Sequence, residues 1–260
     1  MKNMKISVST ICWMHGDRRT ALQKAAHAGF EAVEMIIMAP EIAGFHNHSL
    51  RTVTVETLKN EYKEFNLKCS GLHIGGLPTD GRLDGALEYA HNAIDAAAEL
   101  GANLLVMGGP DRASEPFRPY IEAVESLIPH LEKKSVRIAL ENHHYNWVQF
   151  IQDYDFIFDF IKSPLVGMTL DTGHFTAAGV DPEEVAKKFA SRVFNVHVKD
   201  HIGAKSVEMG MGVTNNRGCV IALREAGYDG YLTQEIEIDR ELADAAAADG
   251  LKYMQVLARQ

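Results

Sequence analysis

The chain has no basic block, no long apolar run and few cysteines, and each of these absences argues against a class of protein. Its 26 Lys and Arg residues are outnumbered by 35 Asp and Glu residues, which gives a formal net charge of −9. A nucleic-acid partner is disfavoured, because neutralising backbone phosphates requires clustered cations. No stretch approaches the ~20 continuous apolar residues of a transmembrane helix, so we expect no membrane span and no membrane partner.

Cysteine usage and the first residues of the chain bear on its location. Cys12, Cys69 and Cys219 are odd in number and show no paired C-x-x-C spacing. This pattern favours a reducing compartment, with each thiol as a small core residue rather than a nucleophile or half of a disulfide. The opening MKNMKISVSTICW lacks the apolar run and the small-residue cleavage site of a signal peptide. The expected location is the cytoplasm.

Apolar runs and amphipathic stretches alternate from one end of the chain to the other. The predicted strands are 4–12, 32–37, 67–74, 103–108, 137–142, 166–171, 193–199 and 231–236. The predicted helices are 19–29, 51–65, 84–100, 117–133, 149–162, 182–190, 217–227 and 239–258, the last interrupted by Gly250. Eight strand–helix pairs in about this length are typical of a (β/α)8 TIM barrel. We therefore predict an α/β fold with one TIM-barrel domain over residues 1–260.

The alternative architecture is an open, doubly wound parallel sheet. Such a sheet commonly carries a G-x-G-x-x-G turn after its first strand, where this chain has ISVSTICWMHGD. Chemically active residues after the fifth, sixth, seventh and eighth predicted strands also suit a closed ring better.

Four polar residues, Glu141, Asp171, His197 and Glu235, stand at the downstream ends of the runs RIALE, VGMTLD, VFNVH and YLTQE. A β/α barrel gathers these strand ends on one face. Three carboxylates and an imidazole brought to one point repel one another unless a cation lies between them. The pattern therefore predicts one divalent metal ion, best Mn²⁺, with Mg²⁺, Co²⁺ or Zn²⁺ as alternatives. An octahedral ion with four protein ligands keeps two positions for adjacent substrate oxygens.

The motifs LEN (140–142), LDTGH (170–174), VHVKD (196–200) and QEIE (234–237) resemble those of the xylose isomerase-like TIM barrel superfamily. That superfamily includes sugar isomerases and epimerases, inosose dehydratases, dehydroshikimate dehydratases and type-IV apurinic endonucleases. The resemblance implies that Glu141, Asp171, His197 and Glu235 are the metal ligands. It also implies a homo-oligomer, a dimer or a tetramer.

Proton transfer next to a carbonyl is the chemistry that this set of residues favours. The metal would polarise the carbonyl and stabilise an enediolate, while Glu141 and Glu235 act as acid and base from two sides. Candidate substrate contacts come from the family pattern, from strand parity or from position at a strand end: His174, Lys199, His143, His73, Glu34 and Trp13. By the same parity, His144 is expected to point away from the site.

The leading hypothesis is thus a metal-dependent isomerase or epimerase acting on a small sugar or keto-polyol. A dehydratase using the same enolate chemistry is the first alternative, followed by a metal-dependent hydrolase or endonuclease and by a non-catalytic sugar-binding protein. ENHHYNW, at 141–147, lacks the arginine and second glutamate of the ketose 3-epimerases that we compare. After His197 the Asp-x-His pair of the apurinic endonucleases is missing, which disfavours DNA repair.

Overall fold

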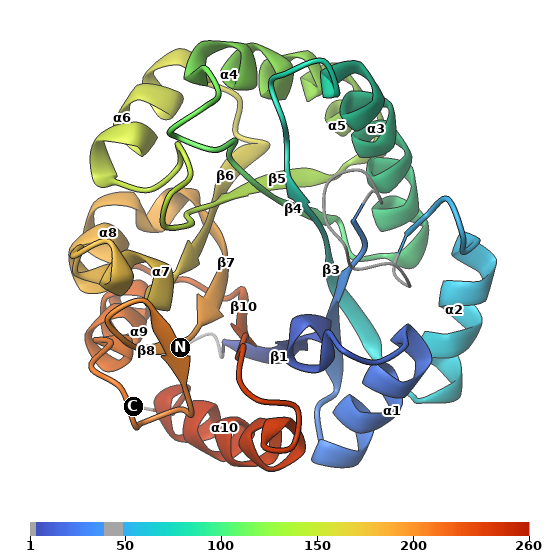
Figure 1. Cartoon of the computed structure of the whole chain (residues 1–260), viewed down its shortest axis with the longest axis vertical. Helices are drawn as coiled ribbons and strands as arrows, with labels where there is room; N and C mark the ends of the chain where they lie inside the picture. Colours follow the sequence, from blue (N-terminus) through green and yellow to red (C-terminus); the bar gives the residue numbers. More distant parts are fainter. Residues whose placement is uncertain (1–3, 39–48, 260) are drawn as a thin grey trace.

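The eight predicted strands form a closed parallel barrel in the computed structural model, which describes residues 4–38 and 49–259 (Figure 1). They are β1 (Lys5–Ser9), β2 (Ala32–Ile36), β3 (Lys68–Gly76), β4 (Leu104–Gly108), β5 (Arg137–Glu141), β6 (Val166–Asp171), β7 (Val193–Val198) and β10 (Tyr231–Gln234). Each strand pairs with its neighbours in the sequence, and β10 closes the ring on β1. The predicted (β/α)8 TIM barrel is confirmed.

Helices surround the barrel, as Figure 1 shows. They are α1 (Arg18–Ala28), α2 (Val55–Glu64), α3 (Leu83–Leu100), α4 (Phe117–Ser126), α5 (Ile128–Lys134), α6 (Ile151–Phe160), α7 (Thr172–Ala177), α8 (Pro182–Phe189), α9 (Asn216–Glu225) and α10 (Ala243–Leu257). Side chains cap several of them: Asp17 accepts a hydrogen bond from the backbone N–H of Thr20 at the start of α1. In the described residues no helix is long and apolar enough to cross a bilayer.

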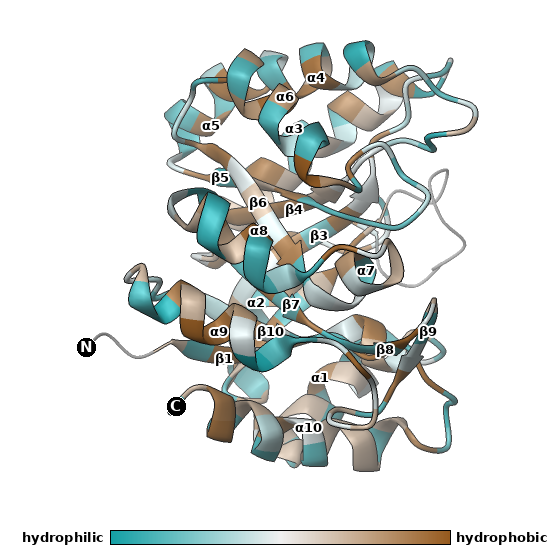
Figure 2. Ribbon diagram, turned by 90° about the vertical axis from the view of Figure 1, so that its left-hand side faces the viewer, coloured by the Kyte–Doolittle hydropathy of each residue, from teal (hydrophilic) through white to brown (hydrophobic). Residues whose placement is uncertain are grey.

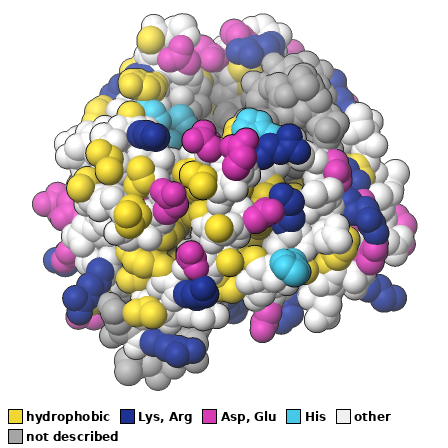
Figure 3. Space-filling view, turned by 60° about the horizontal axis from the view of Figure 1, so that its bottom comes forward, with side chains coloured by type: hydrophobic (Ala, Val, Ile, Leu, Met, Phe, Trp, Pro, Cys, Tyr) yellow, Lys and Arg dark blue, Asp and Glu magenta, His cyan; other side chains and the backbone are white. Residues whose placement is uncertain are grey.

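The barrel strands are apolar because helices cover their outer face and other strands cover their inner face. Every residue of β4 is buried, and its sequence LLVMG has no polar side chain. Figure 2 shows such apolar strands enclosed by helices on which polar and apolar positions alternate. On the face seen in Figure 3, Lys and Arg side chains are scattered among acidic and apolar ones.

The alternation of side chains along each strand decides which residues point into the barrel. Lower in the barrel, a small cluster formed by Leu104, Val106, Ala139 and Phe194 is apolar. One step further along the same face of β5, Ala139 is followed by Glu141 at the carboxyl end of the strand. The charged side chains therefore lie above an apolar plug, at the end where the β-to-α loops begin.

Two predictions about the continuity of a helix were wrong, each for an identifiable reason. The segment 117–133 is divided into α4 and α5, with Pro129 in the first turn of α5, because proline cannot donate the hydrogen bond that a continuous helix needs there. Gly250 does not interrupt α10. A Cβ atom at Gly250 would lie 2.4 Å from Oε1 of Gln234, so glycine allows this helix to approach β10 closely.

The predicted strand 4–12 ends at Ser9 and is followed by the 3-10 helix η1 (Thr10–Trp13). A short helix and a hairpin at the carboxyl ends of other strands were also not predicted. The short helix α7 begins directly after β6, and an antiparallel hairpin of β8 (Asp200–Ile202) and β9 (Lys205–Val207) follows β7. The carboxylate of Asp200 accepts hydrogen bonds from the backbone N–H groups of Gly210, Gly212 and Thr214, which fixes the loop after the hairpin. Both elements enlarge the wall of the barrel mouth.

Candidate metal centre at the barrel mouth

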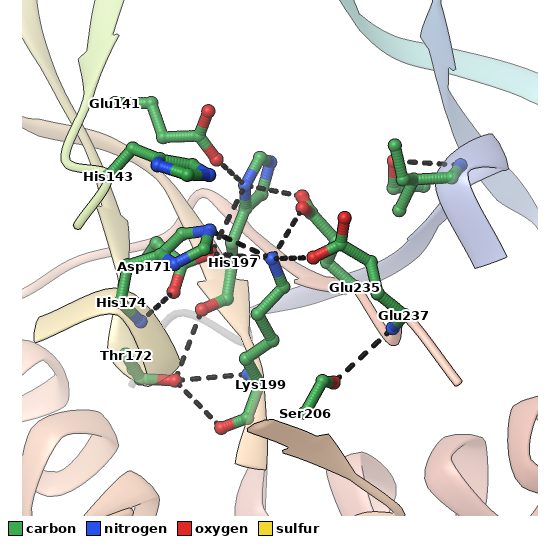
Figure 4. Close-up of polar contacts among 12 residues, drawn as sticks. Glu141, His143, Asp171, Thr172, His174, His197, Lys199, Ser206, Glu235 and Glu237 are labelled. Carbon is green, nitrogen blue, oxygen red and sulfur yellow. Dashed lines mark hydrogen bonds and ion pairs between the residues drawn. The ribbon is translucent and has the colours of Figure 1, made fainter. Parts of the chain in front are cut away.

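The structure brings Glu141, Asp171, His197 and Glu235 together, as their strand-end positions predicted. Each offers one ligand atom, and these four atoms lie within 4.8 Å of one another. Glu141, Asp171 and His197 come from the ends of β5, β6 and β7, and Glu235 follows β10 directly (Figure 4). All four are buried, with Asp171 and His197 fully inaccessible to solvent.

The two ring nitrogens of His197 face different carboxylates. Nδ1 lies 2.5 Å from Oε1 of Glu141 and 2.6 Å from Oε2 of Glu235. On the opposite side of the ring, Nε2 lies 2.8 Å from Oε1 of Glu34. If a metal ion displaced the proton from Nδ1, the carboxylate of Glu34 would keep the remaining ring proton on Nε2.

The burial of so many charges shifts their pKa values in opposite directions. Burial raises the pKa of Asp171 to about 7, although the nearby Lys199 opposes this shift. Burial also disfavours the charged form of Glu235, but His197 and Lys199 outweigh it and lower the pKa of this carboxyl to about 2. For His197, desolvation is outweighed by Glu235, Glu34 and Glu141, which hold its pKa well above the usual value. The carboxylates thus stabilise positive charge at the centre of the cluster.

Two carboxylate oxygens give a direct test of whether a cation fits. Oδ2 of Asp171 and Oε2 of Glu235 are buried and have no hydrogen bond of good geometry among the described residues. The groups that face them are Nζ of Lys199, 3.5 Å from Oδ2, and Nδ1 of His197, 2.6 Å from Oε2. Buried carboxylate oxygens that lack a hydrogen bond are costly unless a cation balances their charge. With Nδ1 of His197 and an oxygen of Glu141 they form an O,O,N,O donor set that suits a hard or borderline dication.

Lys199 is a fully buried ammonium group beside this cluster. Its Nζ lies 2.8 Å from Oε1 of Glu235, 2.9 Å from Oε2 of Glu237 and 3.5 Å from Oδ2 of Asp171. Desolvation would lower the pKa of Lys199, but Asp171 and Glu235 outweigh it and raise that pKa well above the ordinary value. The predicted position of Lys199 at the barrel mouth is correct.

His174 lies between Lys199 and the loop after β5. Nζ of Lys199 is 3.1 Å from its Nε2, and Nδ1 of His144 is 2.8 Å from its Nδ1. Burial and the charge of Lys199 hold the pKa of His174 well below the usual value, so this ring is neutral. The ring of His143 packs against it, with centroids 3.9 Å apart.

The prediction that His144 points away from the site was wrong. Strand alternation supported it, but β5 ends at Glu141, and beyond that residue the backbone no longer alternates between two faces. His144 turns back to contact His174, and one nitrogen each from His143, His144 and His174 lie within 4.8 Å of one another.

The other three candidates occupy different positions. His73 lies at the cluster, with Nε2 3.1 Å from Oε2 of Glu141. Glu34 lies beneath it, and its two oxygens contact His197 and the side-chain amide of Asn195. Trp13 lies apart: its indole N–H donates to Asp244, and it lines a pocket formed by the segments after β1 and β10. Of the three, His73 and Glu34 contact members of the four-residue cluster.

Three positions of the sequence LDTGH have separate structural reasons. Oδ1 of Asp171 accepts a hydrogen bond from the backbone N–H of His174 and caps α7. The Thr172 hydroxyl bonds the backbone of Lys199. Gly173 is required by close packing, because a Cβ atom there would lie 2.6 Å from Cβ of Lys199. The motif therefore docks α7 onto the end of β7.

Sequence reasoning missed two sets of supporting residues. Asn142 exchanges two hydrogen bonds with the backbone of Asp171, at 2.9 and 2.8 Å, and joins the ends of β5 and β6. Beneath the cluster, a buried hydrogen-bonded chain runs from Ser7 through Thr233 and Asn195 to Glu34. Spacing could have indicated part of this chain, since Asn195 and Thr233 each stand two residues before a clustered residue and share its face.

Comparison with known proteins identifies the family. The family model of the xylose isomerase-like TIM barrel matches residues 22–257. The chain belongs to this family. One curated relative, an inosose dehydratase of Mesomycoplasma hyopneumoniae (strain 7448), is 24% identical over 225 residues, which cover 77% of this chain and 71% of the relative. A 3-oxo-isoapionate decarboxylase of Pectobacterium atrosepticum is 35% identical over 103 residues, 40% of this chain and 36% of that protein.

Solved structures of the same fold match almost the whole chain. A D-tagatose 3-epimerase-like protein has a TM-score of 0.78 at 21% identity, covering 98% of this chain and 99% of that one. An IOLI protein with a bound zinc atom has a TM-score of 0.79 at 18% identity, covering 98% of both chains. The probable 3-DHS dehydratase AsbF of Bacillus anthracis has a TM-score of 0.78 at 17% identity, covering 97% and 99%. At these identities the likeness shows the shared fold.

Proposed function

We propose that the protein is a divalent-metal-dependent isomerase or epimerase of a small sugar or keto-polyol. The observation that carries the proposal is the buried convergence of Glu141, Asp171, His197 and Glu235, with two carboxylate oxygens that lack a hydrogen-bond partner among the described residues. Membership of a family whose curated relatives include sugar- and cyclitol-processing enzymes supports an enzymatic role for this cluster.

The four clustered residues would hold one dication, with Nδ1 as the donor atom of His197. The donor set favours Mn²⁺ and is compatible with Mg²⁺, Co²⁺ and Zn²⁺, and a structural relative was solved with zinc. When bound, such an ion polarises a substrate carbonyl as a Lewis acid. Glu34 would keep Nδ1 of His197 unprotonated through its contact with Nε2.

Glu141 and Glu235 are the proposed acid and base. They come from the ends of β5 and β10, with β6 and β7 between them in the ring, so they approach a bound substrate from different sides. One carboxylate removes the proton from the carbon next to the carbonyl, and the other returns a proton. Return to the opposite face of that carbon gives an epimer. Return to the neighbouring carbon, with the hydroxyl proton relayed from one oxygen to the other, gives an isomer.

The remaining residues of the mouth would orient the substrate oxygens. Lys199 offers an ammonium group that can steady a developing oxyanion. The neutral ring of His174, together with His143 and His73, offers hydrogen-bonding nitrogens of the kind that bind hydroxyl groups. Trp13 lines a separate pocket, so we propose that it forms an apolar wall at the edge of this region.

A dehydratase acting on a keto-sugar or a cyclitol is the second candidate. The curated relative of greatest coverage described above is an inosose dehydratase, and AsbF shares the fold. The same proton abstraction leads to dehydration if a hydroxyl group on the next carbon departs instead of a proton returning. A nearby acid such as Glu235 or Lys199 would protonate that leaving group.

Product analysis in D₂O tests both candidates. The protein, loaded with Mn²⁺, is incubated with ketopentoses, ketohexoses and inososes, and the products are identified by mass spectrometry and NMR. An epimerase is expected to yield an epimer that carries deuterium at the carbon that lost its proton. An isomerase is expected to yield an isomer that carries deuterium at the neighbouring carbon. A dehydratase is expected to yield a product lighter by one water. If protein shown to bind Mn²⁺ gives neither result across this panel, the proposed function is wrong.

Replacing Glu34 by Gln is expected to weaken binding of Mn²⁺ by about 10–100-fold, the usual effect of losing a partner that orients a metal-ligating histidine. The neutral amide no longer favours a proton on Nε2 of His197, so Nδ1 is more often protonated. Competition with a metal-binding dye measures the affinity. Glu88→Gln, the same change at an exposed position of α3, should bind Mn²⁺ like the wild type. Equal affinities in the two variants would show that Glu34 does not act on His197.

A further inference from the structure

Glu237 occupies the outward side of Lys199. Its Oε2 lies 2.9 Å from Nζ, and its side chain is 36% exposed, whereas that of Lys199 is fully buried. The backbone N–H of Glu237 donates to the hydroxyl of Ser206 in β9, so the hairpin after β7 holds this carboxylate over the ammonium group (Figure 4). A solute that enters from the mouth therefore meets Glu237 before it meets Lys199.

Negative charge exceeds positive charge around the centre. Among the described residues, five carboxylates gather there, from Glu34, Glu141, Asp171, Glu235 and Glu237. In the described part of the chain, no lysine or arginine other than Lys199 lies within ion-pair distance of these carboxylates. The segment 39–48, which lies outside the described residues, contains no Lys or Arg. A bound dication leaves the carboxylates in excess, even with His73 protonated.

A buried ammonium group beside a metal centre would ordinarily attract a carboxylate or phosphate of a substrate. Here Lys199 already contacts Glu235 and Glu237, and Asp171 lies nearby. An incoming anion would have to displace Glu237 from Nζ or approach it as a like charge. Hydroxyl and keto groups meet no such penalty, because they carry no net charge that Glu237 would repel.

Resting on the proposed function, we infer that Glu237 is a specificity-determining residue that excludes anionic substrates. The site then acts on an uncharged polyhydroxy carbonyl compound and discriminates against its carboxylated or phosphorylated counterparts. Glu237→Gln keeps the shape of the side chain and an oxygen that can accept from Lys199, but it removes the negative charge. The variant should therefore admit anions without losing the geometry of the centre.

Glycolate and glycolamide have similar shapes, and both present a hydroxyl oxygen next to a second oxygen. Glycolate is an anion and glycolamide is neutral, so comparing them isolates the effect of charge. Each is titrated into protein loaded with Mn²⁺, and displacement of metal-bound water is followed by the relaxation of water protons. In Glu237→Gln we expect the ratio of the glycolate to the glycolamide dissociation constant to fall about tenfold relative to the wild type, because one like charge is removed near the binding position. Glu241→Gln, the same change at an exposed residue without a contact to Lys199, should leave the ratio unchanged.

Each outcome bears on the inference. An unchanged ratio in Glu237→Gln, an equal fall in both variants, or no water displacement by either probe in any protein would overturn it. So would a wild-type preference for a phosphorylated or carboxylated substrate over its uncharged form in kcat/KM. Failure to bind Mn²⁺ at all would instead contradict the proposed function, and the relaxation signal before titration shows this separately.

Discussion

Replacing Glu235 by Gln is expected to reduce turnover by about 10²–10⁴-fold, the range that positioned acid–base groups contribute. Gln has nearly the same shape as Glu and can still accept a hydrogen bond from Lys199, but its amide cannot take up or return a proton. Steady-state kinetics on the substrate identified in D₂O measure the loss. Because Glu235 also faces the proposed metal position, the assay is made at saturating Mn²⁺, with bound metal determined in parallel.

Two comparisons make the Glu235 result specific. Glu88→Gln, on the exposed face of α3, should retain wild-type turnover, and both variants should give the circular dichroism spectrum of the folded barrel. If metal-saturated Glu235→Gln keeps turnover within a few-fold of the wild type, this carboxylate is not the acid or base. A protein that only binds sugar would show no turnover in either form but would retain its ligand in both.

Exhaustive chelation is expected to abolish turnover, and Mn²⁺ is expected to restore it. The same ion should raise the thermal midpoint of the chelated protein, since it relieves repulsion among buried carboxylates whose oxygens otherwise lack partners. At a free concentration of about 100 Kd, binding adds ~2.7 kcal/mol to the free energy of unfolding. For a domain of this size that corresponds to a shift of roughly 5–10 °C.

Differential scanning calorimetry on metal-free protein with and without Mn²⁺ measures this shift, and Asp171→Asn is its matched control. That variant replaces the Asp171 carboxylate, which contributes a proposed ligand oxygen, by a neutral amide, so its midpoint should depend much less on added metal. Turnover that persists unchanged after metal analysis shows no bound ion would rule out the proposed chemistry. If none of Mn²⁺, Mg²⁺, Co²⁺ and Zn²⁺ changes the thermal midpoint of unfolding, there is no metal centre at this position.

The convergence of the four clustered residues could be predicted because it depends on one rule. In a closed parallel barrel every strand delivers its carboxyl end to the same face, so a polar residue that ends an apolar run reaches the mouth whatever its distance along the chain. Glu141 and Asp171 are the last residues of β5 and β6, and His197 lies near the end of β7 and points into the barrel. For these residues, the period of two along a strand and the position of the turn were sufficient.

The rule failed where the backbone leaves the strand. His144 was misplaced because alternation stops at Glu141, and the hairpin β8–β9 was missed because its short strands carry no apolar run. Gly250 was taken as a helix breaker, but its role depends on how near α10 lies to Gln234. Such distances between elements are set by packing in three dimensions and leave no periodic trace in the sequence.

The amino-acid sequence by itself determined the barrel, the end at which its chemistry lies and the residues that meet there, since hydrophobic periodicity and strand parity are local properties. The tertiary structure alone decided which atoms face one another. It placed Glu34 on Nε2 of His197, so that Nδ1 faces the carboxylates, and it set Glu237 over Lys199. Those pairings join strands and loops far apart in the chain, and their distances follow from ring closure and side-chain packing, which no local pattern encodes.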